Sequence, residues 1–283
     1  MLWKGRRQSE NIEDRRGMPG RKVALGGGLG ALAVTIIVLL LGGNPEEVVQ
    51  NLQTTPTSGQ EQTRALTAEE RELGEFAGVI LADTEDVWKQ IFQQDGTQYR
   101  EPKLVMFSNA TDSACGFAQS ATGPFYCPGD EKVYIDLSFF QEMQQRLGAS
   151  GDFAWAYVIA HEVGHHVQNQ LGVMEQVQGK QQGLSQQEAN QLLVRMELQA
   201  DFLAGVWAHH AQRLKNLLEE GDIEEGLNAA ASVGDDRIMK REQGYVVPDA
   251  FTHGTSAQRV RWFTLGYKTG DLHQGDTFAA DEL

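Results

Sequence analysis

The chain has 283 residues, of which 41% are hydrophobic and 22% are charged, and its formal net charge is −15. This length and composition suit one large or two small globular domains and exclude a wholly disordered chain. Because an acidic surface repels phosphate backbones, we expect no nucleic-acid partner.

Charge and hydrophobicity are unevenly distributed near the start of the chain. Residues 1–22 contain seven Lys and Arg against three Asp and Glu, and residues 23–41 (VALGGGLGALAVTIIVLLL) carry no charge. A helix of 19 residues extends about 28 Å, close to the thickness of a bilayer core. We interpret residues 1–22 as a basic cytoplasmic segment and residues 23–41 as one transmembrane helix.

This orientation places everything after the span on the periplasmic or extracellular side of the inner membrane. A cleaved signal peptide is the alternative, but its apolar region is usually shorter and no A-x-A-like site follows Leu41. Gly26 and Gly30 form a GxxxG pattern that would permit a weak homo-oligomer through the span.

A polar linker is expected over residues 42–66, and residues 67–283 would form the folded domain. Thr67 and Glu70 form a capping box, which predicts a helix from this point to about Phe92.

Two short segments, residues 103–108 and 132–139, are rich in β-forming side chains and predict strands. The loop between them contains the chain's two cysteines, Cys115 and Cys127. Outside the cytoplasm they can form a disulfide, which would stabilise the fold by roughly 3 kcal/mol. Two buried free thiols are the alternative.

The second half of the chain is predominantly helical in pattern. Asp152 is a candidate N-cap for a helix that ends near Gly172, and the capping box at Ser185 and Glu188 begins a long helix that reaches about Glu220. Further helices are expected at residues 223–231 and 256–266. The predicted fold class is therefore α+β, mainly helical with a small sheet, preceded by the transmembrane helix.

The first of these helices carries the motif His161-Glu162-x-x-His165. Residues four apart on a helix share one face, so both imidazoles can reach one ion, and Glu162 is placed beside that ion as a base. His166 is about 100° from His165 around the helix and cannot easily share the ion.

A catalytic zinc site needs a third protein ligand. Glu197 and Asp201 lie four residues apart on the next long helix, among apolar neighbours. Glu197 would bind zinc, while Asp201 would accept a hydrogen bond from the far nitrogen of a ligand histidine and fix its tautomer. A helix face paired with Lys or Arg is the alternative.

These residues resemble a known group of enzymes. HExxH followed by a helix with ExxxD resembles the gluzincin, thermolysin-like metallopeptidases. The runs GPFYCPGDEKVYIDLSFF, AYVIAHEVGHHVQNQLG, ELQADFLAGVWAHH and HGTSAQRVRWFTLGYKTGD resemble the bacterial neutral zinc metallopeptidase family of YpfJ-like proteins. The resemblance implies a zincin-like domain with one Zn²⁺ held by His161, His165 and Glu197, and with Glu162 as catalytic base.

The resemblance also suggests two features of substrate binding. The segment 132–139 would pair with an extended substrate, or is an ordinary sheet strand. His253, followed by Arg259, would stabilise the oxyanion, or is a loop histidine bonded to backbone.

We therefore expect a membrane-anchored zinc endopeptidase that acts on proteins or peptides outside the cytoplasm. The alternative from another class is a non-catalytic, zinc-stabilised scaffold or binding protein of the cell envelope.

Overall fold

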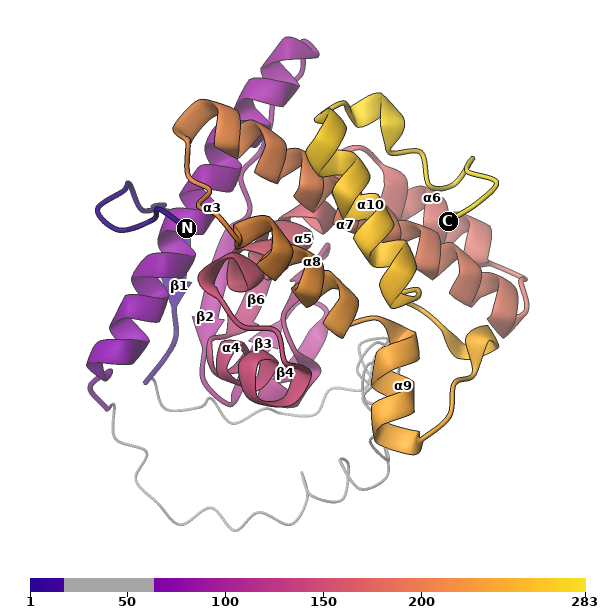
Figure 1. The fold of residues 1–283 in the computed structure, drawn as a ribbon, viewed down its shortest axis with the longest axis horizontal. Helices are drawn as coiled ribbons and strands as arrows, with labels where there is room; N and C mark the ends of the chain where they lie inside the picture. Colours follow the sequence, from indigo (N-terminus) through magenta and orange to yellow (C-terminus); the bar gives the residue numbers. More distant parts are fainter. Residues whose placement is uncertain (18–63) are drawn as a thin grey trace.

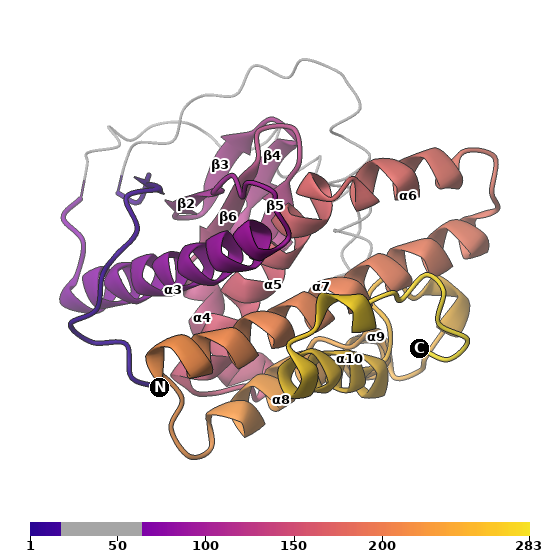
Figure 2. The same cartoon turned by 90° about the horizontal axis from the view of Figure 1, so that it is seen from above.

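The computed structural model describes residues 1–17 and 64–283. A mixed sheet lies against a set of long helices, and α5 (Asp152–Gln170), which carries the HExxH motif, runs through the middle of them (Figure 1). In the second view α5 and α7 (Gln186–Lys215) lie between the sheet and α10 (Ser256–Thr269) (Figure 2). The predicted α+β class is confirmed.

The remaining elements are shorter or lie at the periphery. The other helices are α3 (Ala68–Gln94), α4 (Ser138–Glu142), α6 (Val173–Gln181), α8 (Asp222–Ser232) and α9 (Asp235–Gln243), and a π-helical turn η2 spans Met143–Leu147. The 3-10 turns are η1 (Ser120–Thr122), η3 (Pro248–Ala250) and η4 (Leu272–Gln274). The strands are β1 (Ile12–Asp14), β2 (Lys103–Phe107), β3 (Ala110–Ser113), β4 (Gly116–Gln119), β5 (Phe125–Cys127) and β6 (Lys132–Asp136).

Local sequence rules located the helix starts well. The predicted capping boxes at Thr67 and Ser185 are both present, each with its reciprocal glutamate contact. The cap of α5 is Gly151 instead of Asp152, which occupies the first helical turn. The long helix α7 ends at Lys215, before the predicted Glu220, because Asn216 adopts a left-handed conformation.

The main sheet has the order β1-β2-β6-β5, with β5 antiparallel to β6 and the other pairs parallel. The prediction that residues 132–139 pair with a substrate is wrong for β6, because β6 already pairs with β2 on one side and with β5 on the other. Within the described residues, β5 is the edge strand at that end of the sheet.

The predicted disulfide between Cys115 and Cys127 is confirmed. Cys115 lies at the tip of the β3–β4 hairpin, which the sequence reading had treated as loop, and Cys127 ends β5. The bond therefore attaches the hairpin to the edge strand.

Glycine allows the helices that carry the motifs to approach closely. A Cβ on Gly164 of α5 would lie 3.0 Å from the backbone oxygen of Ala200 on α7. Gly205 of α7 and Gly266 of α10 likewise face each other's helix backbone, with no room for a side chain. The contact at Gly164 brings α5 and α7 together beside the histidines, and the contacts at Gly205 and Gly266 bring α7 and α10 together.

Residues 1–17 pack against the same folded unit as residues 64–283. β1 pairs in parallel with β2, with Ile12 opposite Leu104. The predicted division into segments 1–22, 23–41, 42–66 and 67–283 did not anticipate this contact.

No helix in residues 1–17 or 64–283 is long and apolar enough to cross a bilayer. The predicted span at residues 23–41 lies outside the described residues.

Candidate metal centre

Three side chains from two helices converge in the middle of the molecule. His161 and His165 project from α5, and Glu197 projects from α7 toward both. One ligand atom from each lies within 4.8 Å of the others, and both histidines are only 7% exposed. The three residues predicted as metal ligands are therefore brought together.

The donor set and its spacing fit zinc. Nε2 of His161 lies 3.2 Å from Oε2 of Glu197, and Nε2 of His165 lies 3.4 Å from Oε1 of Glu197. Tetrahedral ligands about 2.0–2.1 Å from a zinc ion are about 3.3–3.4 Å apart, and two imidazoles with one carboxylate form a known catalytic ligand set. One cation can therefore bind all three groups without a rearrangement of the two helices.

The electrostatics of the site favour a cation. Burial raises the pKa of Glu197, but the neighbouring His165 and His161 outweigh burial and hold that pKa well below its usual value. Burial lowers the pKa of His161, yet the carboxylates of Asp201 and Glu197 raise it to about 10. The carboxylates thus favour positive charge where the imidazoles meet.

Glu162 lies beside the three ligands and is 8% exposed. Its carboxylate makes no hydrogen bond to another described residue, and burial raises its pKa. A buried carboxylate with free lone pairs is suited to accept a proton in the cleft.

The carboxylate of Asp201 contacts His161 at Nδ1, the ring nitrogen that does not face Glu197. Its Oδ1 lies 2.9 Å from Nδ1 of His161, which leaves Nε2 facing Glu197, and the Tyr157 hydroxyl also donates to it. Arg259 of α10 donates to both oxygens of Asp201, at 2.8 and 2.9 Å. Although burial raises the pKa of Asp201, Arg259 and His161 outweigh burial and lower it to about 2.

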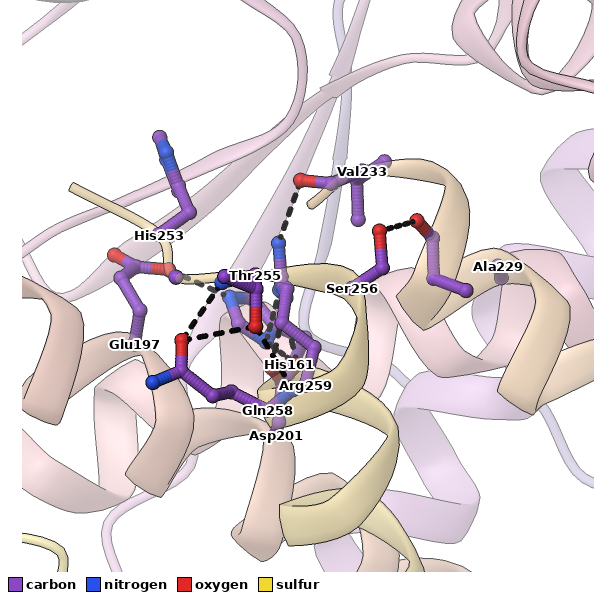
Figure 3. Close-up of polar contacts among 12 residues, drawn as sticks. His161, Glu197, Asp201, Ala229, Val233, His253, Thr255, Ser256, Gln258 and Arg259 are labelled. Atoms are coloured by element: carbon purple, nitrogen blue, oxygen red, sulfur yellow. Dashed lines mark hydrogen bonds and ion pairs between the residues drawn. The ribbon is translucent and has the colours of Figure 1, made fainter. Parts of the chain in front are cut away.

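Figure 3 shows Arg259 between Asp201 and the carbonyl of Val233, to which it also donates at 3.2 Å. Arg259 is 3% exposed. The sequence reading had placed this arginine beside His253 as a possible part of the oxyanion site. Its contacts show instead that it fixes Asp201, which in turn contacts Nδ1 of the candidate ligand His161.

His165, the other candidate ligand, is oriented by an uncharged side chain that the sequence reading missed. Nδ1 of His165 lies 2.8 Å from Oε1 of Gln168, which is fully buried. The amide nitrogen of Gln168 donates to the Met196 carbonyl and to Oε1 of Gln199. Because that nitrogen is engaged, the amide oxygen faces His165, whose Nδ1 must carry the proton and whose Nε2 stays free for a metal. The spacing of three residues on one helix was a signal that could have found it.

His253 lies on the loop before α10, beside Glu197 (Figure 3). Its Nδ1 is 3.2 Å from Oδ1 of Asp235, and the side chain is 35% exposed. Oδ2 of Asp235 accepts the backbone N–H groups of Thr252, His253 and Gly254 at 2.7–3.0 Å. Burial lowers the pKa of His253, but Asp235 and Glu197 raise it. Asp235, which the sequence reading did not single out, therefore fixes the loop and orients the ring.

His166 is fully buried and points away from the ligands. Its Nδ1 accepts from the Tyr126 hydroxyl at 3.0 Å, and its Nε2 donates to the Arg100 carbonyl at 2.6 Å. His166 therefore connects α5 to the edge strand β5.

A second acidic group in the described residues consists of Asp152, Asp222 and Glu225. The Met1 ammonium lies 2.8 Å from Oδ1 of Asp152 and 3.2 Å from Oδ1 of Asp222. Asp152 and Asp222 are therefore paired with a cation of the chain itself, and Glu225 accepts from the Phe153 amide.

An α+β fold in which two histidines and a glutamate converge beside a buried carboxylate defines a candidate zinc hydrolase. A family model described as "Putative neutral zinc metallopeptidase" matches residues 1–278, and the chain belongs to that family. Zinc is the metal that this family implies.

The chain is similar to several proteins whose printed names assign no function. It is 51% identical to "Uncharacterized protein YpfJ" of Escherichia coli strain K12, over 98% of this chain and 99% of that protein. It is 45% identical to "Uncharacterized protein Mb2605" of Mycobacterium bovis, over 70% of this chain and 68% of that protein. No solved structure matches the chain.

Proposed function

We propose that the protein is a zinc-dependent endopeptidase of the gluzincin type, which cleaves proteins or peptides. The observation that carries this proposal is Glu162, a buried carboxylate to which no other described residue donates a hydrogen bond, next to His161, His165 and Glu197. His161, His165 and Glu197 would hold one zinc ion, which when bound supplies a Lewis acid that polarises the scissile carbonyl and makes water more acidic.

The chain's own residues then perform the proton transfers. The Glu162 carboxylate accepts a proton from the attacking water and delivers it to the nitrogen of the leaving amine. The ring of His253, held by Asp235 through Nδ1, donates a hydrogen bond from Nε2 to the oxyanion that develops on the carbonyl.

Substrate backbone would pair with the outer edge of β5. This strand is the sheet edge nearest the motif helix, because Tyr126 of β5 contacts both His166 and Asn169 of α5. Pairing through backbone groups gives affinity with little demand on substrate sequence.

We also propose that the domain works outside the cytoplasm and that residues 23–41 attach the protein to the inner membrane. The disulfide between Cys115 and Cys127 supports an oxidising compartment. The length of the apolar run supports contact with the bilayer.

Substitution of the base tests the proposal most directly. Glu162→Gln should retain one zinc per chain by elemental analysis, while cleavage of a casein substrate falls at least about a thousandfold, because the amide cannot accept the proton. Glu175→Gln, an exposed change on α6, is the matched control and should cleave like the parent. Parent-like cleavage by the Glu162 variant would overturn the mechanism.

A zinc-stabilised scaffold is the second candidate. It predicts stoichiometric zinc and a zinc-dependent melting temperature, but no chelator-sensitive proteolysis by the parent. The presence of Glu162 favours the enzyme, because a metal held only for stability does not require a base.

A further inference from the structure

Residues 1–17 are attached to the rest of the molecule by backbone hydrogen bonds at widely separated points. The amides of Leu2, Ser9 and Arg15 donate to the carbonyls of Leu217, Gly78 and Met106, at 2.8, 2.9 and 2.7 Å. In the other direction, the amide of Leu104 donates to the carbonyl of Asn11 at 2.9 Å. The segment therefore follows one defined path across α3 and into the sheet.

The surface beneath this path contains buried carboxylates that the segment contacts, of which Asp83 also pairs with Lys215. Asp83 and Glu85 of α3 are each 1% exposed. Arg6 contacts Oδ1 of Asp83 at 3.2 Å, and Nδ2 of Asn11 donates to Oε1 of Glu85 at 2.9 Å. Burying carboxylates without such partners would cost several kcal/mol.

Helix α3 is also shaped to receive the segment. Gly74 and Gly78 lie one turn apart on the face that residues 1–17 cross. A Cβ at Gly74 would overlap the Arg16 guanidinium, and one at Gly78 would lie 3.4 Å from the Gln8 side chain. Glycine in a helix interior costs about 1 kcal/mol relative to alanine, and close approach of another segment offsets that cost.

The basic residues of the segment are paired within the protein. Lys4, Arg15 and Arg16 contact Glu72, Glu13 and Asp14 at 2.6, 2.8 and 2.6 Å. These charges therefore belong to the same folded unit as residues 64–283 or to the segment's own ion pairs.

We propose that residues 1–17 are a permanent part of the folded unit formed by residues 64–283 and lie on the same side of the membrane as those residues. A single crossing between them would separate β1 from β2 and leave Asp83 and Glu85 without these partners. The proposal depends on the interface alone and is independent of peptidase activity.

Cysteine labelling in whole cells tests the proposal on the full chain. Glu10→Cys and Gln178→Cys each introduce one exposed thiol, on the segment and on α6, while the native cysteines are joined to each other. A membrane-impermeant maleimide is added to spheroplasts before and after lysis. The proposal requires both positions to label under the same condition. Labelling of one position before lysis and of the other only after lysis would overturn it.

Hydrogen exchange on the purified full chain provides a second measurement. The amides of Ser9 and Arg15 should exchange at least about a hundredfold more slowly than in an unstructured chain, because both bond to the body of the protein. Exchange of these amides at the unstructured rate would also overturn the proposal. A dependence of their protection on protein concentration would do so too, because it would assign the contacts to a segment exchanged between two copies.

Discussion

Two groups of carboxylates differ in their partners, one at the interface of residues 1–17 with α3 and one between α5 and α7. At the interface, Asp83 contacts Arg6 and Lys215, and Glu85 contacts Arg7. Between the helices, Glu197 faces two imidazoles and contacts no Lys or Arg among the described residues. The interface carboxylates form ion pairs with Lys and Arg side chains of the chain itself. The oxygens of Glu197 instead face two imidazoles, where they can bind a cation from solution. We infer that the first cluster stabilises the fold and that the second performs the chemistry.

The largest effect that separates the two clusters should come from Glu197→Ala. Zinc affinity should fall by more than about a hundredfold, since loss of a ligand exceeds the effect of losing its supporting contacts. A competition titration with a chromogenic chelator measures this affinity. Gln191→Ala, an exposed change on the same helix, should leave it unchanged. If both variants bind zinc like the parent, Glu197 is not a ligand.

Asp201→Asn changes a carboxylate that combines the properties of the two groups. Its carboxylate is matched by Arg259, as at the interface, but it also orients His161. We expect zinc affinity to fall about 10–100-fold. We also expect the free energy of unfolding to fall by roughly 3–5 kcal/mol, because the buried Arg259 charge loses its partner.

The double variant Asp201→Asn, Arg259→Met separates these two contributions. Removal of the unmatched charge should recover part of the stability, while zinc affinity stays low because His161 still lacks its carboxylate. Chemical denaturation and the chelator titration measure the two quantities. Recovery of both together would contradict a separate orienting role for Asp201.

The outcome for this network shows how far sequence reasoning can reach. Helical spacing placed His161, His165, Glu197 and Asp201 on the correct faces, because that spacing is a local property of the chain. It could not find Arg259 or Asp235 as supports, since their contacts join segments between 18 and 98 residues apart. Local rules likewise found the capping boxes.

Residues 1–17 show more clearly that local sequence patterns do not reveal contacts between distant segments. Their charge and the apolar run that follows predict a separate cytoplasmic segment when only neighbouring residues are considered. Their partners on α3 lie about seventy residues further on, as Arg6 and Asp83 illustrate with a separation of 77. Strand β1 is only three residues long and depends on β2 for its pairing, so no local pattern identifies it.

A smaller effect on zinc affinity is expected at Gln168, the uncharged side chain that contacts His165. Gln168→Met removes the acceptor for Nδ1 of His165 but keeps a similar side-chain volume. Zinc affinity should fall about tenfold, at the low end for loss of a supporting contact, because an amide polarises the imidazole less than a carboxylate does. Gln178→Met on the exposed face of α6 is the control. A loss as large as that of Asp201→Asn would contradict the distinction between charged and neutral support.

The smallest effect should appear where residues 1–17 join the sheet, as a dependence of stability on pH. Burial raises the pKa of Glu13, but Lys132 and Arg15 outweigh burial and lower it from 4.5 to about 2. A carboxyl whose pKa is lower in the folded state stabilises that state above the unfolded pKa, and the contribution disappears as the pH falls through the folded pKa. The stability difference between the parent and Glu13→Gln should therefore be constant above about pH 4.5 and vanish near pH 2.

Urea unfolding between pH 7 and pH 2.5 measures this difference, with Glu10→Gln, an exposed neighbour, as control. A difference that is absent at every pH would mean that Glu13 makes no ion pair in solution, and the match of charges at the interface would fail there. A difference that shrinks below pH 4.5 only for Glu13→Gln would show that the ion pairs of Glu13 stabilise the folded state.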